Sequence, residues 1–156
     1  MGLYENMRNE PVSQLALREP VVCGPQDTVR RAIEKMREKK LGCVIIVDDD
    51  RKPVGMFTES MLMQLLVNDT DALARPIESH MAEKWPWVKL NDPVVDVLEA
   101  MQAKNVRFIC VVDDDGRLAG LTGQKGLMEY VADHFPEQVM VQRIGCTPYT
   151  QQREGA

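Results

Sequence analysis

The sequence predicts an α/β (α+β) fold in which two β-α-β-β-α units pack together as an α/β sandwich around a pseudo-twofold axis. Three observations support this. The chain matches itself without a gap when it is shifted by 65 positions, which places Asp27 on Asp92. Each copy contains a stretch of helical apolar spacing followed by a continuous apolar run, and both runs end at an Asp-Asp-Asp triplet. One such unit has a sheet too small to bury both of its faces, so the two units should pack together.

The first copy opens with an extended segment, Pro20 to Cys23, and continues as a helix with Asp27 as a candidate N-cap. Val29, Ile33 and Met36 follow at the spacing of an amphipathic helix. A buried strand, a shorter strand and a second helix complete the copy, over Cys43–Val47, Val54–Phe57 and Glu59–Val67.

The second copy repeats this order. Asp92 is its candidate N-cap, and Pro93 is well placed at the first helical position. An extended segment is predicted over Pro86–Lys89, followed by a helix that contains Val94, Leu98 and Met101. A buried strand, a shorter strand and a second helix follow, over Phe108–Val112, Leu118–Thr122 and Gln124–Asp133. The resulting domain organisation is an N-terminal lead (1–11), a first unit (12–67), a linker (68–76), a second unit (77–135) and a polar C-terminal tail (136–156).

Composition limits the function. The net charge of −5 and the pI of about 5.1 argue against nucleic-acid binding, while leaving room for a local basic pocket that holds one small anion. The four cysteines are far apart, which favours a reducing compartment and predicts a cytoplasmic protein. No apolar run approaches the roughly 18 residues that a membrane span needs, so no membrane association is expected.

The ordered set of motifs resembles the CBS domain, which normally occurs as a tandem pair called a Bateman module. The resemblance covers about residues 12 to 135 and is carried by matching stretches in both copies: Pro20–Val29, Leu41–Asp48 and Gly55–Met61, then Asn91–Val94, Val106–Asp113 and Gly120–Gly126. It implies a non-catalytic regulatory module. Such modules often bind an adenosine compound, such as AMP, ADP, ATP or S-adenosylmethionine, in clefts between the repeats.

The resemblance also implies site residues. In the family, the third strand ends in Gly-apolar-apolar-Thr/Ser-x-x-Asp, whose hydroxyl and carboxylate hold the ribose; Thr58 matches the hydroxyl. Two walls of an adenine slot are expected from Leu41, Gly42 and Cys43 on one side and from Val22 and Cys23 on the other. Arg107 precedes a buried strand at the position that matches Gly42, where it could reach a phosphate, and Lys125 is a weaker candidate for the same role.

The sequence departs from this pattern at three positions. Met61 stands where the first copy should carry the aspartate, and Gly123 and Gly126 replace the hydroxyl and the aspartate of the second copy. Loss of a charge-assisted hydrogen bond costs about 1.5–3 kcal/mol, or about 10- to 100-fold in affinity. We therefore expect at most one good nucleotide site per chain, centred on Thr58.

Each candidate also has a purely structural interpretation. Thr58 is a good N-cap for a helix that starts at Glu59, and Gly42 suits a helix C-cap. Val22 and Cys23 could simply pack in the core, and Arg107 could be solvated. The two Asp triplets suit hairpin turns better than a metal site, and no metal or catalytic cluster can be assembled from the sequence.

The function predicted on these grounds is that of a regulatory pair with no obligatory cofactor, which binds an adenosine nucleotide or S-adenosylmethionine as effector and acts on a separate partner protein. The alternative is a ligand-free module for dimerisation or protein interaction, with degraded nucleotide sites. Because CBS pairs commonly associate through their helical faces, the resemblance also implies a homodimer with isologous contacts.

Overall fold

The structure of the protein, a computed structural model, describes residues 2–134. A helix, α1 (Leu3–Asn9), precedes the two repeats. The first repeat consists of β1 (Val22–Cys23), α2 (Val29–Lys39), β2 (Cys43–Val47), β3 (Pro53–Thr58) and α3 (Glu59–Asn68). The second consists of β4 (Trp87–Lys89), α4 (Val94–Lys104), β5 (Phe108–Val112), β6 (Leu118–Gly123) and α5 (Gln124–His134). Short 3-10 turns cover Val12–Gln14, Thr70–Ala74 and Ile77–Ser79.

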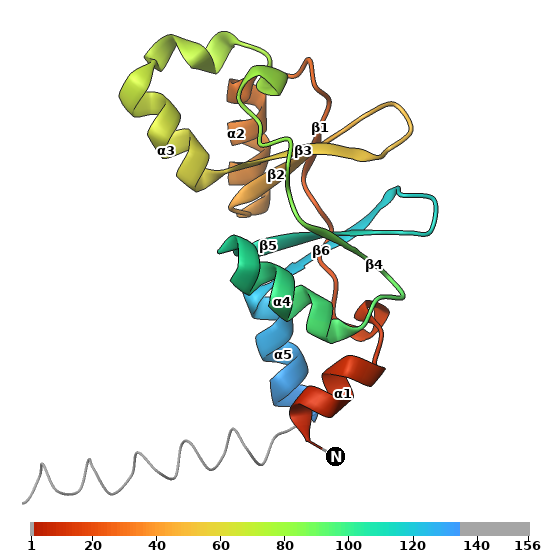
Figure 1. The fold of residues 1–156 in the computed structure, drawn as a ribbon. Helices are drawn as coiled ribbons and strands as arrows, with labels where there is room; N and C mark the ends of the chain where they lie inside the picture. The colour runs from red at the N-terminus through yellow and green to blue at the C-terminus, as the bar shows by residue number, and fades with distance from the viewer. Residues whose placement is uncertain (1, 135–156) are drawn as a thin grey trace, which may run out of the picture.

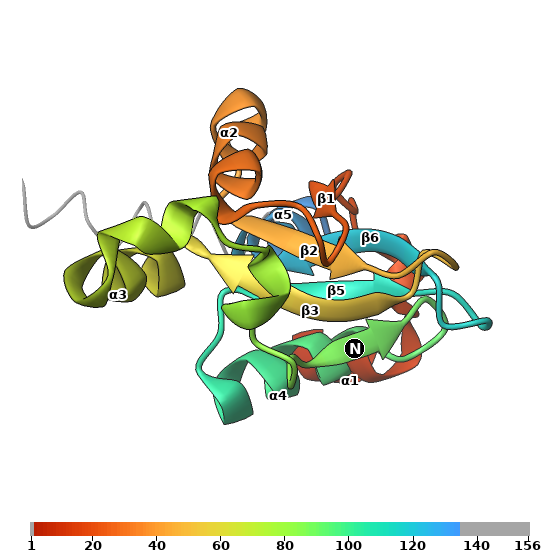
Figure 2. The same cartoon turned by 90° about the horizontal axis from the view of Figure 1, so that it is seen from above.

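Each repeat forms its own three-stranded sheet, and the two sheets have the same topology. In the first sheet β1 runs parallel and β3 antiparallel to β2; in the second, β4 and β6 have the same relation to β5. The sheets meet in the middle of the molecule, with α2 and α3 above them and α4 and α5 below (Figure 1). Seen from above, the strands of the two sheets lie over one another and α3 extends to the side (Figure 2). The predicted fold class is confirmed.

The segment that leads into each repeat pairs with the other repeat. Arg18 exchanges two backbone hydrogen bonds with Leu121 on β6, at 2.9 and 3.0 Å, and Ala82 exchanges two with Met56 on β3, at 3.0 and 2.8 Å. Leu121 and Met56 are equivalent under the 65-residue offset. This reciprocal exchange is the backbone signature of the pseudo-twofold relation, and it makes the repeats depend on each other structurally.

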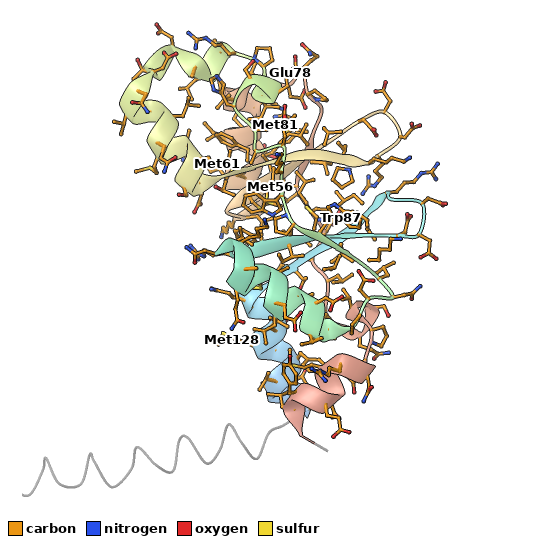
Figure 3. The ribbon with its side chains drawn as sticks, viewed as in Figure 1. Met56, Met61, Glu78, Met81, Trp87 and Met128 are labelled. Atoms are coloured by element: carbon orange, nitrogen blue, oxygen red, sulfur yellow. The ribbon has the colours of Figure 1, made fainter. Side chains whose placement is uncertain are left out.

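Two glycines at equivalent positions allow this close approach. A Cβ at Gly55 would overlap the side chain of Met81, and a Cβ at Gly120 would lie 3.0 Å from the Cβ of Leu17. Met56 and Met81 lie close together beside this crossing (Figure 3). Gly55 and Gly120 therefore match in the sequence because each packs against the segment that leads into the other repeat, here called its lead-in, at residues 81–82 for Gly55 and at residues 17–18 for Gly120.

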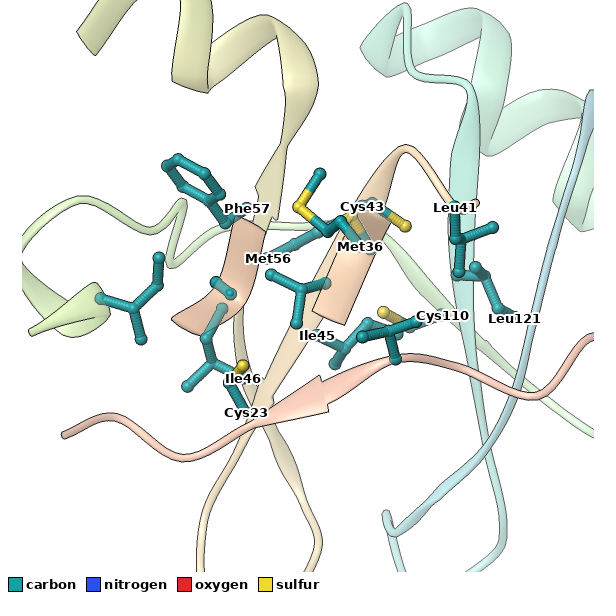
Figure 4. Close-up of a cluster of buried hydrophobic side chains, with 14 of the residues drawn as sticks. Cys23, Met36, Leu41, Cys43, Ile45, Ile46, Met56, Phe57, Cys110 and Leu121 are labelled. Carbon is teal, nitrogen blue, oxygen red and sulfur yellow. The ribbon is translucent and has the colours of Figure 1, made fainter. Parts of the chain in front are cut away.

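The core of the first repeat extends into the second. Ile45, Met56 and Phe57 are fully buried, and Cys110 and Leu121 of the second repeat belong to the same apolar cluster (Figure 4). The continuous apolar strands are buried on both faces because a helix layer covers one face and the other sheet covers the opposite face. The second core lies between β5, α4, α5 and the N-terminal helix α1.

The helix starts differ from the sequence prediction by one residue. The N-caps are Thr28 for α2 and Pro93 for α4, so the predictions of Asp27 and Asp92 as caps, and of Pro93 as the first helical residue, were wrong. Each of the two carboxylates accepts a hydrogen bond from the backbone amide three residues earlier, at 2.9 and 2.8 Å. The aspartates thus close the turn before the helix, and the helix begins after the next residue.

The Asp triplets are turn residues, as predicted. Asp48 Oδ1 accepts hydrogen bonds from the amides two and four residues later, both at 2.9 Å. Asp113 Oδ1 makes the same two bonds in the second repeat, at 2.9 and 3.0 Å. In each triplet, the first aspartate closes the hairpin turn by the same two hydrogen bonds.

The N-terminal helix packs against the second repeat. Tyr130 of α5 donates a hydrogen bond of 2.6 Å to Glu10, and Tyr4 of α1 donates one of 3.2 Å to Glu99 of α4. The predicted tail over 136–156 lies outside the described residues, and the predicted domain limits stay a prediction.

Candidate functional site

A cavity with a volume of about 730 Å³ lies between the two repeats. It opens where β3 and β6 end and where α3 and α5 begin, so each repeat contributes one half. Cavities that take small molecules measure about 300–1,000 Å³. The size and the position between domains both suit one organic ligand.

The first-repeat half is built around the start of α3. Thr58 is the N-cap of α3 and accepts a hydrogen bond of 3.3 Å from the amide of Met61, which confirms its structural role. Its hydroxyl proton is not used in that bond, so it can still be donated to a ligand. Glu59 is the next residue on the cavity wall. Its carboxylate lies close to Gly42, since a Cβ added at Gly42 would be 3.2 Å from Glu59 Oε2. This half therefore presents a hydroxyl and a carboxylate side by side.

Gly42 is not the C-cap that ends α2. That place is taken by Lys40, which adopts the left-handed conformation at φ 52°, so the C-cap interpretation of Gly42 was wrong. The absence of a side chain at Gly42 instead makes room for Glu59 and for Phe108, whose ring would lie 3.5 Å from an added Cβ.

Aromatic side chains of the second repeat complete the first half. Trp85 and Phe108 line the cavity together with Leu41, and the indole of Trp85 donates a hydrogen bond of 3.0 Å to the backbone oxygen of Phe108. That bond fixes the indole in place. Flat aromatic surfaces are suitable platforms for a nucleobase, since stacking on one is worth about 1–3 kcal/mol.

The second-repeat half lacks side chains where the first has them. A Cβ at Gly123 would overlap the backbone oxygen of Arg107, and one at Gly126 would lie 2.5 Å from Thr122 Oγ1. Both glycines are therefore required by close packing at the start of α5. The second repeat therefore has no room for a threonine at position 123 or an aspartate at position 126 in its present backbone arrangement.

The cavity is positively charged although the chain is acidic. Among residues 2–134, its ionisable lining residues are one carboxylate, Glu59, and four cations, which are Arg18, Lys40, Arg107 and Lys125. None of these four cations forms a salt bridge within residues 2–134. Unpaired cations around one cavity favour an anionic ligand.

The structure brings together four of the seven side chains predicted for the site: Leu41, Gly42, Thr58 and Arg107. The other three, Val22, Cys23 and Cys43, do not lie on the cavity wall. Val22 and Cys23 pair with the middle of β2, and all three pack in the first core.

The buried thiols of this core, Cys23, Cys43 and Cys110, are poor nucleophiles and poor metal ligands. Burial raises the pKa of Cys23 to about 11 and the pKa values of Cys43 and Cys110 to about 12. They therefore stay protonated near neutral pH, where only the thiolate is a nucleophile or metal ligand. Across residues 2–134, no group of three or more His, Cys, Asp or Glu side chains is placed to hold a metal ion.

Sequence reasoning missed the contributions that cross between the repeats. Arg18 comes from the lead-in of the first repeat but lies beside β6, and Trp85 comes from the lead-in of the second but lines the first-repeat half. The signal available in the sequence was the pair of matched glycines, Gly55 and Gly120, which mark where the lead-ins cross.

Across the described residues, 2–134, the helices are too short or too polar to span a bilayer.

Comparisons with known proteins agree with this architecture. An uncharacterized protein of Methanopyrus kandleri is 29% identical over 127 residues, which are 79% of this chain and 63% of that protein. Hypoxic response protein 1 of Mycobacterium tuberculosis is 26% identical over 132 residues, 82% of this chain and 89% of that one. The chain thus spans less than two thirds of the length of the first of these relatives.

Solved structures show the same fold. A CBS domain protein from Pyrobaculum aerophilum, complexed with AMP, superimposes with a TM-score of 0.70 at 24% identity, over 76% of this chain and 90% of that one. The CBS domain pair of protein MJ0100, in complex with 5-methylthioadenosine and S-adenosyl-L-methionine, gives 0.70 at 20% identity over 80% and 97%. The CBS domain family model matches residues 12–68 and 77–133. The chain therefore belongs to the CBS domain family, as a tandem pair.

Proposed function

We propose that this chain is a regulatory CBS pair that binds an adenosine nucleotide in the cavity between its repeats and acts on a separate partner protein. The observation that carries the proposal is the composition of that cavity. It combines the hydroxyl of Thr58, the aromatic surfaces of Trp85 and Phe108, and an excess of positive charge. These groups match the ribose, the base and the phosphates of one molecule.

The solved relatives support a ligand of this class. AMP is bound in the Pyrobaculum aerophilum structure, and 5-methylthioadenosine and S-adenosyl-L-methionine are bound in the MJ0100 structure. We propose that the ligand here contacts Leu41, Gly42, Thr58 and Arg107, while Val22, Cys23 and Cys43 support the cavity wall from the core. The protein acts in this proposal as a cytoplasmic regulator without catalytic activity.

A second proposal concerns assembly. Large apolar side chains are exposed on α3 and α5: Met63 is 67% exposed, Val67 85% and Met128 72%. Met128 points away from the body of the molecule (Figure 3). We propose that these helical faces form an isologous homodimer. The ligand-free alternative function rests on this same surface, and it predicts dimerisation with no response to nucleotides.

A thermal-shift screen separates the two functions. With AMP, ADP, ATP, S-adenosylmethionine and NADH in turn, saturation at about 100 times Kd adds about 2.7 kcal/mol to stability. For a chain of this size we expect Tm to rise by about 5–10 °C with at least one adenosine nucleotide. If none of these compounds at millimolar concentration changes Tm, the ligand-binding function is wrong and the ligand-free alternative stands.

A pair of threonine variants tests the site itself. Thr58 and Thr28 are both N-caps, of α3 and α2, but only Thr58 lines the cavity. Thr58→Ala and Thr28→Ala should each cost about 1 kcal/mol of stability through the lost cap. Only Thr58→Ala should also reduce the ligand-induced shift, and Thr58→Ser should restore it. An equal ligand response in both alanine variants would overturn the assignment of Thr58.

A further inference from the structure

We propose that the chain has a second ligand site, outside the cavity that contains Thr58, and that this site binds a small planar aromatic molecule with one negative charge, such as an aromatic carboxylate. The site is a groove of about 300 Å³ between β3 of the first repeat and β4 of the second, here called the side groove. Its apolar lining includes Pro53, Val54, Trp85, Pro86 and Trp87. Small-molecule sites measure about 300–1,000 Å³, so the side groove has room for one compact ligand. This proposal goes beyond the nucleotide-binding function and does not depend on it.

The side groove exists because the two repeats differ at two matched positions. Trp85 and Trp87 are the only tryptophans of the chain, and the 65-residue offset matches them with Pro20 and Val22. Val22 is partly buried against the first core, whereas Trp87 is 56% exposed. It lies at the level where the two sheets meet (Figure 3). Both indoles of the chain thus line one groove, and the indole of Trp87 leaves a large flat apolar surface for a ligand to cover.

Trp87 is open to solvent because β4 is an edge strand. Side chains alternate along β4, so Val88 is buried in the second core and Trp87 lies on the opposite face. In the first repeat, Lys35 of α2 covers part of the matching edge by donating a hydrogen bond of 2.9 Å to the backbone oxygen of Val22. The offset places Ala100 at the position of Lys35. The second repeat therefore lacks both the small side chain and the lysine that close the matching place in the first.

The rim of the side groove has an excess of one positive charge. Among residues 2–134, its charged lining residues are Lys84, Lys104 and Glu83, and all three are exposed. None of them forms a salt bridge within those residues. A lysine beside an aromatic surface can form a charge-assisted hydrogen bond with the carboxylate of a ligand whose ring lies on the indole. Glu83 repels further negative charge, so a singly charged carboxylate suits this groove better than a phosphate dianion.

Trp85 forms a wall that the side groove shares with the cavity between the repeats, because it lines both. The hydrogen bond of 3.0 Å from its indole to the backbone oxygen of Phe108 fixes this wall in place. Trp87 lines the side groove but not the cavity. A nucleotide and an aromatic carboxylate can therefore be bound at the same time, and Trp87 reports on the side groove alone.

Titration of the full chain with 2-naphthoate, followed through the indole N–H signals in proton–nitrogen NMR spectra, tests the side groove. The chain gives two such signals, which the variants Trp85→Phe and Trp87→Phe assign. The Trp87 signal should shift saturably, with a Kd on the order of 1 mM for a ligand of this size. Saturating ADP should not displace the ligand. The neutral 2-naphthamide has the same shape, and cyclohexanecarboxylate has the charge without the aromatic ring; both should bind more weakly.

Variants of the groove lining test the residues that carry the proposal. Trp87→Ala should weaken 2-naphthoate about 10-fold, measured through the Trp85 signal, because the stacking surface is lost. Lys84→Gln combined with Lys104→Gln should weaken it about 5-fold. Both variants should bind ADP as the wild type does, because none of these residues lines the cavity. The matched control is Lys89→Gln, which removes an exposed lysine of β4 outside the groove and should change neither affinity.

The outcomes separate the side groove from the proposed function. A Trp87 signal that 2-naphthoate at millimolar concentration leaves unchanged, or 2-naphthoate that ADP displaces, would overturn the side groove as a ligand site and leave the nucleotide function standing. Equal affinity for 2-naphthamide would also overturn it. So would a Trp87 signal that moves only with protein concentration, since that indicates a contact between copies of the chain. Binding of 2-naphthoate at Trp87 by a chain that binds no adenosine compound would support the side groove and contradict the proposed function.

Discussion

Met61→Asp is expected to raise the affinity for an adenosine nucleotide by about 10- to 100-fold, because it adds a charge-assisted hydrogen-bond acceptor worth about 1.5–3 kcal/mol. Met61 lines the cavity in the first turn of α3, and its amide is bonded to the hydroxyl of Thr58. An aspartate here would sit next to that hydroxyl, where it can accept the ribose hydroxyls. The position also suits a negative charge, since a carboxylate in the first turn of a helix is favourable by about 0.3–1 kcal/mol.

Titration of the wild-type and variant proteins with ADP measures this gain. Met61→Asn is the matched control, because it has the same shape as aspartate and loses the same packing against the first core, but it carries no charge. The asparagine variant should show little or no gain. An aspartate variant that binds ADP no better than the asparagine variant would contradict the position of the ribose.

The corresponding changes in the second repeat are expected to damage the protein. A side chain at Gly123 would overlap the backbone oxygen of Arg107, and one at Gly126 would crowd Thr122 Oγ1. Overpacking of this kind costs about 1–3 kcal/mol, and each kcal/mol lowers Tm by about 2–4 °C in a chain of this size. Gly123→Thr and Gly126→Asp should therefore lower Tm by several degrees and should create no second ribose site.

Thermal unfolding and ADP titration check both parts of this expectation. Gly24→Ala is the control, because an added Cβ at Gly24 meets no atom within 4 Å; its Tm should stay near that of the wild type. If Gly126→Asp kept the wild-type Tm and bound a second nucleotide, the second half would be a ribose site that has lost its carboxylate, and our account of its packing would be wrong.

The strands and helices could largely be predicted because local pattern decides them. The runs Cys43–Val47 and Phe108–Val112 are continuous and apolar with turn residues behind them, and both strands have the predicted limits. The helix α1 escaped prediction because it is only seven residues long, too short for a helical period to stand out in the sequence. Its position depends on α4 and α5, through the hydrogen bonds of Tyr4 with Glu99 and of Glu10 with Tyr130, and these two partners lie far away in the sequence.

The cavity could be predicted only in part, for a related reason. Thr58 and Gly42 lie in motifs that are contiguous in the sequence, so the resemblance placed them. Arg18 and Trp85 reach the site because the segment that leads into each repeat crosses to the other repeat. The spacing of apolar residues along the sequence does not indicate such a crossing. The sequence shows that Gly123 lacks a hydroxyl, but only the structure shows that the backbone there leaves no room for one.

The most direct test of a ligand in the cavity uses the two tryptophans as reporters. Trp85 lines the cavity, whereas Trp87 is 56% exposed and does not. In Trp87→Phe, the remaining tryptophan should show a saturable change in fluorescence as ADP is added. In Trp85→Phe, which leaves Trp87 as the reporter, the emission should not respond. Calorimetric binding of ADP to Trp87→Phe with no change in its fluorescence would contradict a ligand held against Trp85 between the two repeats.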